Sequence, residues 1–200
     1  IHYVMLYNEN QQQPPKPAGC DSGIVKGAYK LQESRKSDSG HVRILGSGPI
    51  LQYAREAASL LESDFGVSSE VWSVTSYGEL RREGLEIERH NRLNPQSSES
   101  PYVSKCFGDD TPTIAVSDYI VAVPEMIQRW VGGTFTVLGT DGFGRSDTRE
   151  ELRRFFEIDT KSIVLAALST LEREGIMEEG TVKEQSKKMG INTVREDRAA

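Results

Sequence analysis

Short runs of β-prone residues alternate with segments of helical spacing along most of this 200-residue chain. The expected strands cover residues 26–32, 42–45, 70–74, 113–116 and 135–138. The last four strands are joined by three helix-forming segments. A strand–helix–strand connection is almost always right-handed and makes its two strands parallel. The sequence therefore predicts an α/β fold, a three-layer α/β/α sandwich with a mixed, mainly parallel sheet of five strands.

The first strand differs from the others because no helix follows it. Residues 26–32 reach the next strand through a short polar segment rich in Ser, Lys, Asp and Gly. Short connections of this kind join antiparallel neighbours, whereas parallel strands need a longer crossover. We therefore expect a hairpin-like, antiparallel first strand.

Three helices are expected between the later strands, because their apolar residues recur at helical spacing. They cover residues 50–61, 77–93 and 123–130, and Gly66 can end the first of them. Three further helices close the chain. Asp147, Thr148 and Thr181 each stand three residues before a glutamate, which is the pattern of a capping box at a helix start.

The first residues have a different character from the rest. Residues 1–10 are typical of the end of a strand, and residues 11–22 form a Pro- and Gln-rich linker, because proline fixes φ and donates no hydrogen bond. Residues 23–200 then form the α/β domain. The chain opens inside an apolar run without a Met, so we expect a piece of a longer polypeptide.

Charge and cysteine content narrow the classes of partner. The net charge of −6 and a pI near 5.2 argue against nucleic acid and against an anionic membrane surface, since both require a positive field. The longest apolar run, Ile163–Leu168, is far too short to cross a bilayer. Cys20 and Cys106 form no C-x-x-C pair, which indicates reduced thiols in a cytoplasmic protein.

Small polar residues follow four of the expected strands. They are Gly46-Ser47-Gly48, Thr75-Ser76, Ser117-Asp118 and the segment from Thr140 to Ser146. Ligands of parallel sheets bind beyond the carboxyl ends of the strands, so this pattern suits a phosphate or nucleotide. The third glycine of the dinucleotide fingerprint is missing, however, and tight-turn packing explains the glycines better than cofactor binding does.

No catalytic constellation stands out along the chain. It has neither a G-x-S-x-G elbow nor a P-loop lysine, and His2, His41 and His90 are its three histidines. His41 begins a strand and His90 lies in a charged stretch, so both suit surface positions better than the role of a base. Metal-ligating side chains do not cluster in the sequence.

One segment, Gly139–Asp147, is more specified than a plain turn requires. Its three glycines allow a tight path, Phe143 offers an apolar anchor and Arg145 can project charge. We therefore take this loop as the candidate site, either clamped against a neighbouring domain or subunit or simply capping its own helix. The candidate interface or ligand residues are Asp141, Phe143, Arg145, Ser146 and Asp147.

A set of motifs in the same order resembles a known family. The set comprises Tyr7–Asn10, Gly23–Leu31, Leu45–Gly48, Val71–Ser76, Glu79–Leu80, Ser117–Tyr119 and Gly139–Asp147, followed by Arg149-Glu150 and Leu152-Arg153. Together these residues resemble the carboxyl-terminal, transketolase-like domain of the homodimeric-type pyruvate dehydrogenase decarboxylase, the first component of its complex. The likeness covers nearly the whole chain and is loosest over Thr193–Ala200.

The resemblance implies a parent enzyme that decarboxylates pyruvate on thiamine diphosphate and magnesium. It would then reductively acetylate the lipoyl group of the acyltransferase component, working as a cytoplasmic homodimer. Residues 1–10 would end its pyrimidine-binding domain. The family's Gly-Asp-Gly cofactor motif and catalytic glutamate belong to preceding domains, so we expect no catalytic, cofactor-binding or metal-binding residue in this chain.

The resemblance thus implies a non-catalytic domain that serves dimerisation and packs beside the active site. Two alternatives stay open. One is a regulatory module that binds a nucleotide or phosphate, and the other is a docking surface for the acyltransferase component.

Overall fold

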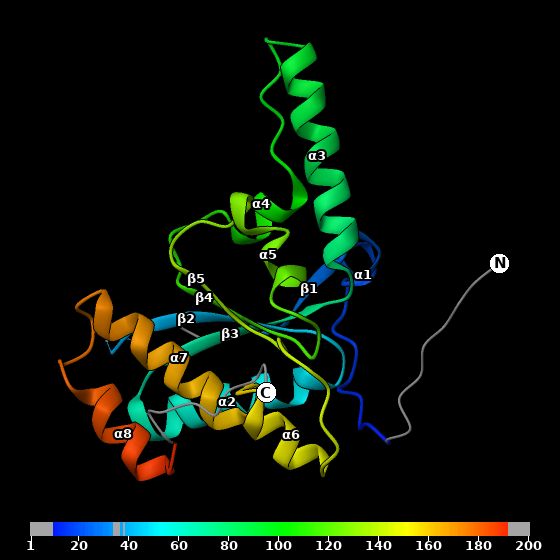
Figure 1. Cartoon of the computed structure of the whole chain (residues 1–200). Coiled ribbons are helices and arrows are strands. Elements are labelled where there is room, and N and C mark those ends of the chain that lie inside the picture. The colour runs from blue at the N-terminus through cyan, green and yellow to red at the C-terminus, as the bar shows by residue number, and fades with distance from the viewer. Residues whose placement is uncertain (1–9, 34–36, 38, 192–200) are drawn as a thin grey trace.

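Five strands form one sheet at the centre of the protein, in a computed structural model that describes residues 10–33, 37 and 39–191 (Figure 1). The strands are β1 (Ala28–Gln32), β2 (His41–Gly46), β3 (Ser68–Val74), β4 (Thr113–Val116) and β5 (Phe135–Leu138). The helices are α1 (Asp21–Lys26), α2 (Leu51–Phe65), α3 (Tyr77–Leu93), α4 (Tyr102–Phe107), α5 (Ala122–Glu125), α6 (Arg149–Phe155), α7 (Thr160–Arg173) and α8 (Thr181–Met189).

The order of the strands across the sheet is β1-β3-β2-β4-β5. β2 runs parallel to both β3 and β4, and β5 runs parallel to β4. β1 is antiparallel to β3. The predicted mixed, mainly parallel five-stranded sandwich is therefore confirmed.

The first strand is antiparallel as expected, but its expected pairing with the next strand in a hairpin is wrong. β1 pairs with β3, with Ala28 opposite Val74 and Lys30 opposite Trp72. Both edges of β2 are already occupied, by β3 and β4, so β2 offers no free edge to β1. The strand also begins later than expected, because Gly27 ends α1 with a φ of 107° that other residues rarely adopt.

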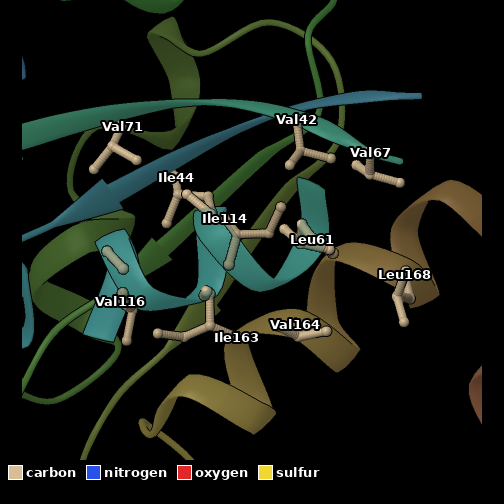
Figure 2. Close-up of a cluster of buried hydrophobic side chains, with 14 of the residues drawn as sticks. Val42, Ile44, Leu61, Val67, Val71, Ile114, Val116, Ile163, Val164 and Leu168 are labelled. Atoms are coloured by element: carbon tan, nitrogen blue, oxygen red, sulfur yellow. The ribbon is translucent and has the colours of Figure 1, made fainter. Parts of the chain in front are cut away.

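Helices cover both faces of the sheet. Figure 1 shows α2, α6, α7 and α8 on one face and α3, α4 and α5 on the other. Figure 2 shows the first core, in which valines and isoleucines of β2, β3 and β4 meet Leu61 of α2 and Ile163, Val164 and Leu168 of α7. In the second core the Trp72 and Phe107 rings meet edge to face, with centroids 4.9 Å apart.

The start of α6 confirms one expected cap. The Thr148 side chain accepts a hydrogen bond from the Glu151 amide at 3.3 Å, as a capping box requires. Asp147 does not cap the helix in this way, because its carboxylate accepts instead from the neighbouring Thr148 amide at 2.7 Å.

The expected cap at Thr181 is wrong, because α8 begins at that residue and Gly180 is its N-cap. A side chain from the preceding helix replaces the cap. The carboxylate of Glu172 accepts hydrogen bonds from the amides of Gly180 at 3.0 Å and Val182 at 2.8 Å. These amides are among the unpaired donors of a helix start, so Glu172 ties α8 to α7.

The expected helix over residues 123–130 is split in two. α5 ends at Glu125, and a 3₁₀ turn covers Gln128–Trp130. The amides of Ile127 and Trp130 donate to carbonyls only three residues back, which is the tighter 3₁₀ pattern. α1 and α4 are six-residue helices, too short for apolar spacing to reveal. The strand expected over residues 1–10 lies outside the described residues but for Asn10.

A charged side chain, Arg43, lies inside the second core although its neighbours Val42, Ile44 and Leu45 on β2 are apolar. Its side chain is 3% exposed, and its Nε donates to Glu70 of β3 while Nη2 donates to Asp109 at 2.9 Å. The second oxygen of Glu70 lies 2.8 Å from Lys30 Nζ, and the first also accepts from the Trp72 indole. The network therefore spans three neighbouring strands.

The carboxylates of this network are held ionised. Burial raises the pKa of Glu70, but hydrogen bonding from Lys30 and the positive charge of Arg43 outweigh it and leave the pKa below its usual value. Burial likewise raises the pKa of Asp109, but the hydrogen bonds from Arg43 and the Thr111 amide, together with the charge of Arg43, outweigh it and leave the pKa below its usual value. Both groups therefore stabilise the folded state in their charged form.

Removing the charge of Glu70 should destabilise the protein strongly. In Glu70→Gln, Arg43 stays buried without its principal counter-charge, which costs about 3 kcal/mol for a broken buried pair. Urea unfolding followed by circular dichroism measures the free energy of unfolding. The matched control, Glu184→Gln, removes an exposed partner of Lys188 and should leave the midpoint nearly unchanged. Equal losses in both variants would contradict this account of the network.

Stability should also fall as the solution becomes acidic. A carboxylate whose pKa is lowered by folding stabilises the protein above its unfolded pKa, and this stabilisation is lost as the pH drops through the folded pKa. Between about pH 6 and about pH 3 the unfolding free energy should therefore decrease. Denaturant titrations across this range should show a smaller decrease in Glu70→Gln, and a decrease of the same size would contradict the assignment.

Candidate functional site

The carboxyl ends of the parallel strands meet at one edge of the sheet, on the right in Figure 1. The small polar segments expected there do gather at this edge. Gly46-Ser47-Gly48 follows β2, Thr75-Ser76 follows β3, Ser117-Asp118 follows β4, and Gly139–Asp147 joins β5 to α6.

The turn after β2 is filled by its own side chains. Ser47 donates to the Ser117 hydroxyl at 3.0 Å, and Ile50 is buried behind it. A Cβ on Gly46 would lie 2.8 Å from the Cα of Leu51, closer than real contacts allow. Glycine is therefore needed at 46 for the close packing of α2 against β2.

The start of the β5–α6 loop is fixed to the turn after β4. The Thr140 amide donates to the carbonyl of Tyr119 at 3.0 Å, and the Thr140 hydroxyl donates to the carbonyl of Asp118 at 2.9 Å. Asp141 accepts from the Val121 amide at 3.1 Å. Asp141 therefore connects the β5–α6 loop to the turn after β4.

The end of the loop is fixed to its own helix. The guanidinium of Arg145 lies 4.2 Å from the centre of the Phe155 ring, a cation–π contact, rather than extending away as the sequence suggested. Asp147 bonds the Thr148 amide, and Ser146 is exposed. Of the five candidate residues, three thus make contacts within the domain.

Phe143 projects between these two anchored ends. Its side chain is 70% exposed. Two more large apolar side chains are exposed on the adjoining turn, Tyr119 at 47% and Ile120 at 52%. Sequence reasoning did not propose these two as site residues, although an apolar pair directly after Ser117-Asp118 is the signal that would have found them.

A hollow of about 770 Å³ lies between α2, α6, α7 and α8, and Arg145 and Asp147 of the candidate loop are among its lining residues. Many of its lining groups are already paired. Arg153 donates to the Tyr53 hydroxyl, and Thr160 donates to Glu56 at 2.8 Å. These contacts join α6 and α7 to α2, so the hollow is explained by helix packing.

The titratable residues give little sign of a reactive centre. Within residues 10–33, 37 and 39–191, no three His, Cys, Asp or Glu side chains come together as metal ligands would. Both cysteines are free thiols, and burial raises the pKa of Cys106. His41 begins β2 as expected, with Nδ1 2.7 Å from the Ser68 hydroxyl, and His90 is exposed.

Among the helices of the described residues, none combines the length and the apolar character that a membrane span requires.

Comparisons with known proteins agree in one family. The family model of the transketolase-like C-terminal domain matches residues 27–159. The chain is 48% identical over 195 residues to the pyruvate dehydrogenase E1 component of Pseudomonas aeruginosa, covering 96% of this chain and 22% of that protein. The E1 components of Haemophilus influenzae and Escherichia coli K12 are 43% and 42% identical, again over 22% of their length.

Solved structures agree on the fold. Transketolase from Campylobacter jejuni superposes with a TM-score of 0.54 at 20% identity, covering 78% of this chain and 20% of that one. Transketolase from Leishmania mexicana gives 0.52 at 18% identity, over 76% and 19% of the two chains. At such identities the likeness extends to the architecture alone.

Substitution of alanine should affect stability differently at two glycines of this edge. Gly46→Ala should lower the unfolding free energy by about 1–3 kcal/mol, because its Cβ meets backbone of α2. Gly144→Ala, with nothing within 4 Å of its Cβ, should cost no stability. Urea unfolding of both variants tests this prediction. An unchanged free energy of unfolding in Gly46→Ala would show that packing against α2 does not require glycine in this turn.

Proposed function

Because the chain belongs to the family of transketolase-like C-terminal domains, we propose that it is the carboxyl-terminal domain of the E1 component of a pyruvate dehydrogenase complex. The observation that carries the proposal is the 48% identity to one such component across 96% of this chain. The chain spans only 22% of that relative, so the activity belongs to a longer parent protein.

The parent decarboxylates pyruvate with thiamine diphosphate and magnesium and reductively acetylates the lipoyl group of the acyltransferase component. It works as a homodimer in the cytoplasm. The cofactors supply the electron sink for the decarboxylation and are held by the parent's other domains. No step of that chemistry runs through a side chain of this domain.

The domain itself has a non-catalytic role, in dimerisation and in packing beside the active site. The polar side chains at the strand ends support this role, because they are used to hold the loops together. Ser47 bonds Ser117, Asp141 bonds the Val121 amide and Asp147 bonds the Thr148 amide. Because these polar groups already have partners within the domain, they can be covered by another part of the protein without losing a hydrogen bond.

The described residues at the carboxyl edge of the sheet also fit the cofactor poorly. A diphosphate with magnesium needs carboxylate or carbonyl oxygens converging on one point. Asp141 and Asp147 are bonded to two different amides at opposite ends of their loop. The turn at Gly46 is closed by α2.

The 200-residue chain alone should neither bind thiamine diphosphate nor decarboxylate pyruvate. Calorimetric titration with thiamine diphosphate and magnesium should give no binding heat, and a coupled assay should detect no carbon dioxide release. The full-length parent, measured in parallel, should show both. Turnover by the 200-residue chain would refute the non-catalytic role, and an inactive parent would refute the assignment to pyruvate dehydrogenase.

A further inference from the structure

Three exposed apolar side chains at the carboxyl edge of the sheet form what we call the edge patch: Tyr119, Ile120 and Phe143. We infer that the edge patch is covered, in the parent protein, by the domain that precedes this chain in the same polypeptide. The inference rests on the proposed function for the existence of that domain, and it names the surface through which the two domains pack.

The patch is held in place by its surroundings. Tyr119 and Ile120 lie on the turn to which Thr140 and Asp141 are hydrogen-bonded, so Phe143 is tied to the same place through its neighbours. A Cβ on Gly139 would lie 2.7 Å from the Tyr119 carbonyl, so the two loops are in close contact there. An ordered patch loses little conformational entropy when it is covered.

Exposure of apolar side chains concentrates at this edge. Among the described residues six large hydrophobic side chains are exposed, and the edge patch supplies three of them. A fourth, Val25 at 77%, lies on α1, whose Ile24 carbonyl accepts from Thr75 just after β3, hence at the same edge. Exposed apolar side chains that gather at one edge of a protein suit an interface.

The size of the patch decides between a tethered and a free partner. Three side chains, each about half to two-thirds exposed, offer on the order of 300 Å². Stable association of separate proteins usually buries more than about 1,000 Å² in total. A domain joined by a linker needs far less, because the linker gives it a high effective concentration.

The path of the linker brings that domain to this edge. In Figure 1 residues 10–20 run along the right-hand side of the molecule, the side on which β2, β3, β4 and β5 end. The next segment, α1, is bonded to that edge, since Gly27 accepts from the amides of Thr75 and Ser76. The linker therefore lies on the same side of the molecule as the edge patch, which follows the ends of β4 and β5.

Amide hydrogen exchange can test the inference without any substitution. Residues 117–121 and 139–147 should exchange at least about tenfold more slowly in the full-length parent than in the 200-residue chain. Residues 93–100 and 175–180, which carry the exposed Leu93 and Ile176, should exchange equally in both. Equal exchange at 117–121 and 139–147 in the two proteins would overturn the inference.

A double variant sharpens the test. With Ile120→Ser and Phe143→Ser in both proteins, the difference in exchange between the parent and the 200-residue chain should largely disappear. The control, Leu93→Ser with Ile176→Ser, changes residues of comparable exposure, 59% and 47%, and should leave that difference intact. If the difference in exchange between the parent and the 200-residue chain persists in the Ile120→Ser, Phe143→Ser variant, these two side chains do not form the interface.

Other occupants give other results. Protection that grows with the concentration of the 200-residue chain would assign the patch to a second copy, and protection that needs the acyltransferase component would assign it to that partner. Either result overturns the inference. Pyruvate decarboxylation by the parent is measured separately. An error in the proposed activity can therefore be distinguished from an error in the inference that the preceding domain covers the edge patch.

Discussion

The central strands of the sheet are buried on both faces, and the rest of the structure depends on this burial. Every residue of β3 and β4 is buried, as are the last five of β2. A parallel sheet of this kind is stable only when helices cover both faces, because its side chains are apolar on each. Because the helices cover both faces, the loops at the ends of the strands are exposed to solvent. The candidate site lies at the carboxyl ends.

Arg43 and Glu70 form a buried charged pair within this layer, and the pair fixes how the strands are aligned. Arg43 stands opposite Glu70 on β3 and opposite Thr113 on β4, so its charge is compensated by direct neighbours in the parallel register. A shift of one residue would turn Arg43 to the other face, into a core of valine and isoleucine. A buried charge in this position makes alternative registers costly even where it adds little net stability.

The sequence revealed local features well and distant pairings poorly. β4 and β5 match their expected bounds, and so does α3, because each has a continuous pattern of its own. The partner of β1 is set by which strand edge remains free, which no local pattern records. The pair Arg43 and Glu70 is hidden for the same reason, although a charge within Val42-Arg43-Ile44-Leu45 signals that a partner exists.

The same division applies to the candidate site. Spacing led to the loop Gly139–Asp147 and to its Phe143, which is exposed as an anchor would be. It did not show that Arg145 lies on Phe155, since that contact depends on the direction of α6.

The shared fold explains why function must come from the loops at this edge. Transketolases of 18–20% identity have the same architecture, so the architecture does not separate them from pyruvate dehydrogenase components. At the carboxyl edge the carboxylates of Asp141 and Asp147 bond to backbone amides of the domain itself. What the edge presents outward there is apolar, in Tyr119, Ile120 and Phe143. Apolar surface contributes free energy only when it is removed from water, and this is the physical reason for our proposal that this edge acts through contact with another part of the protein.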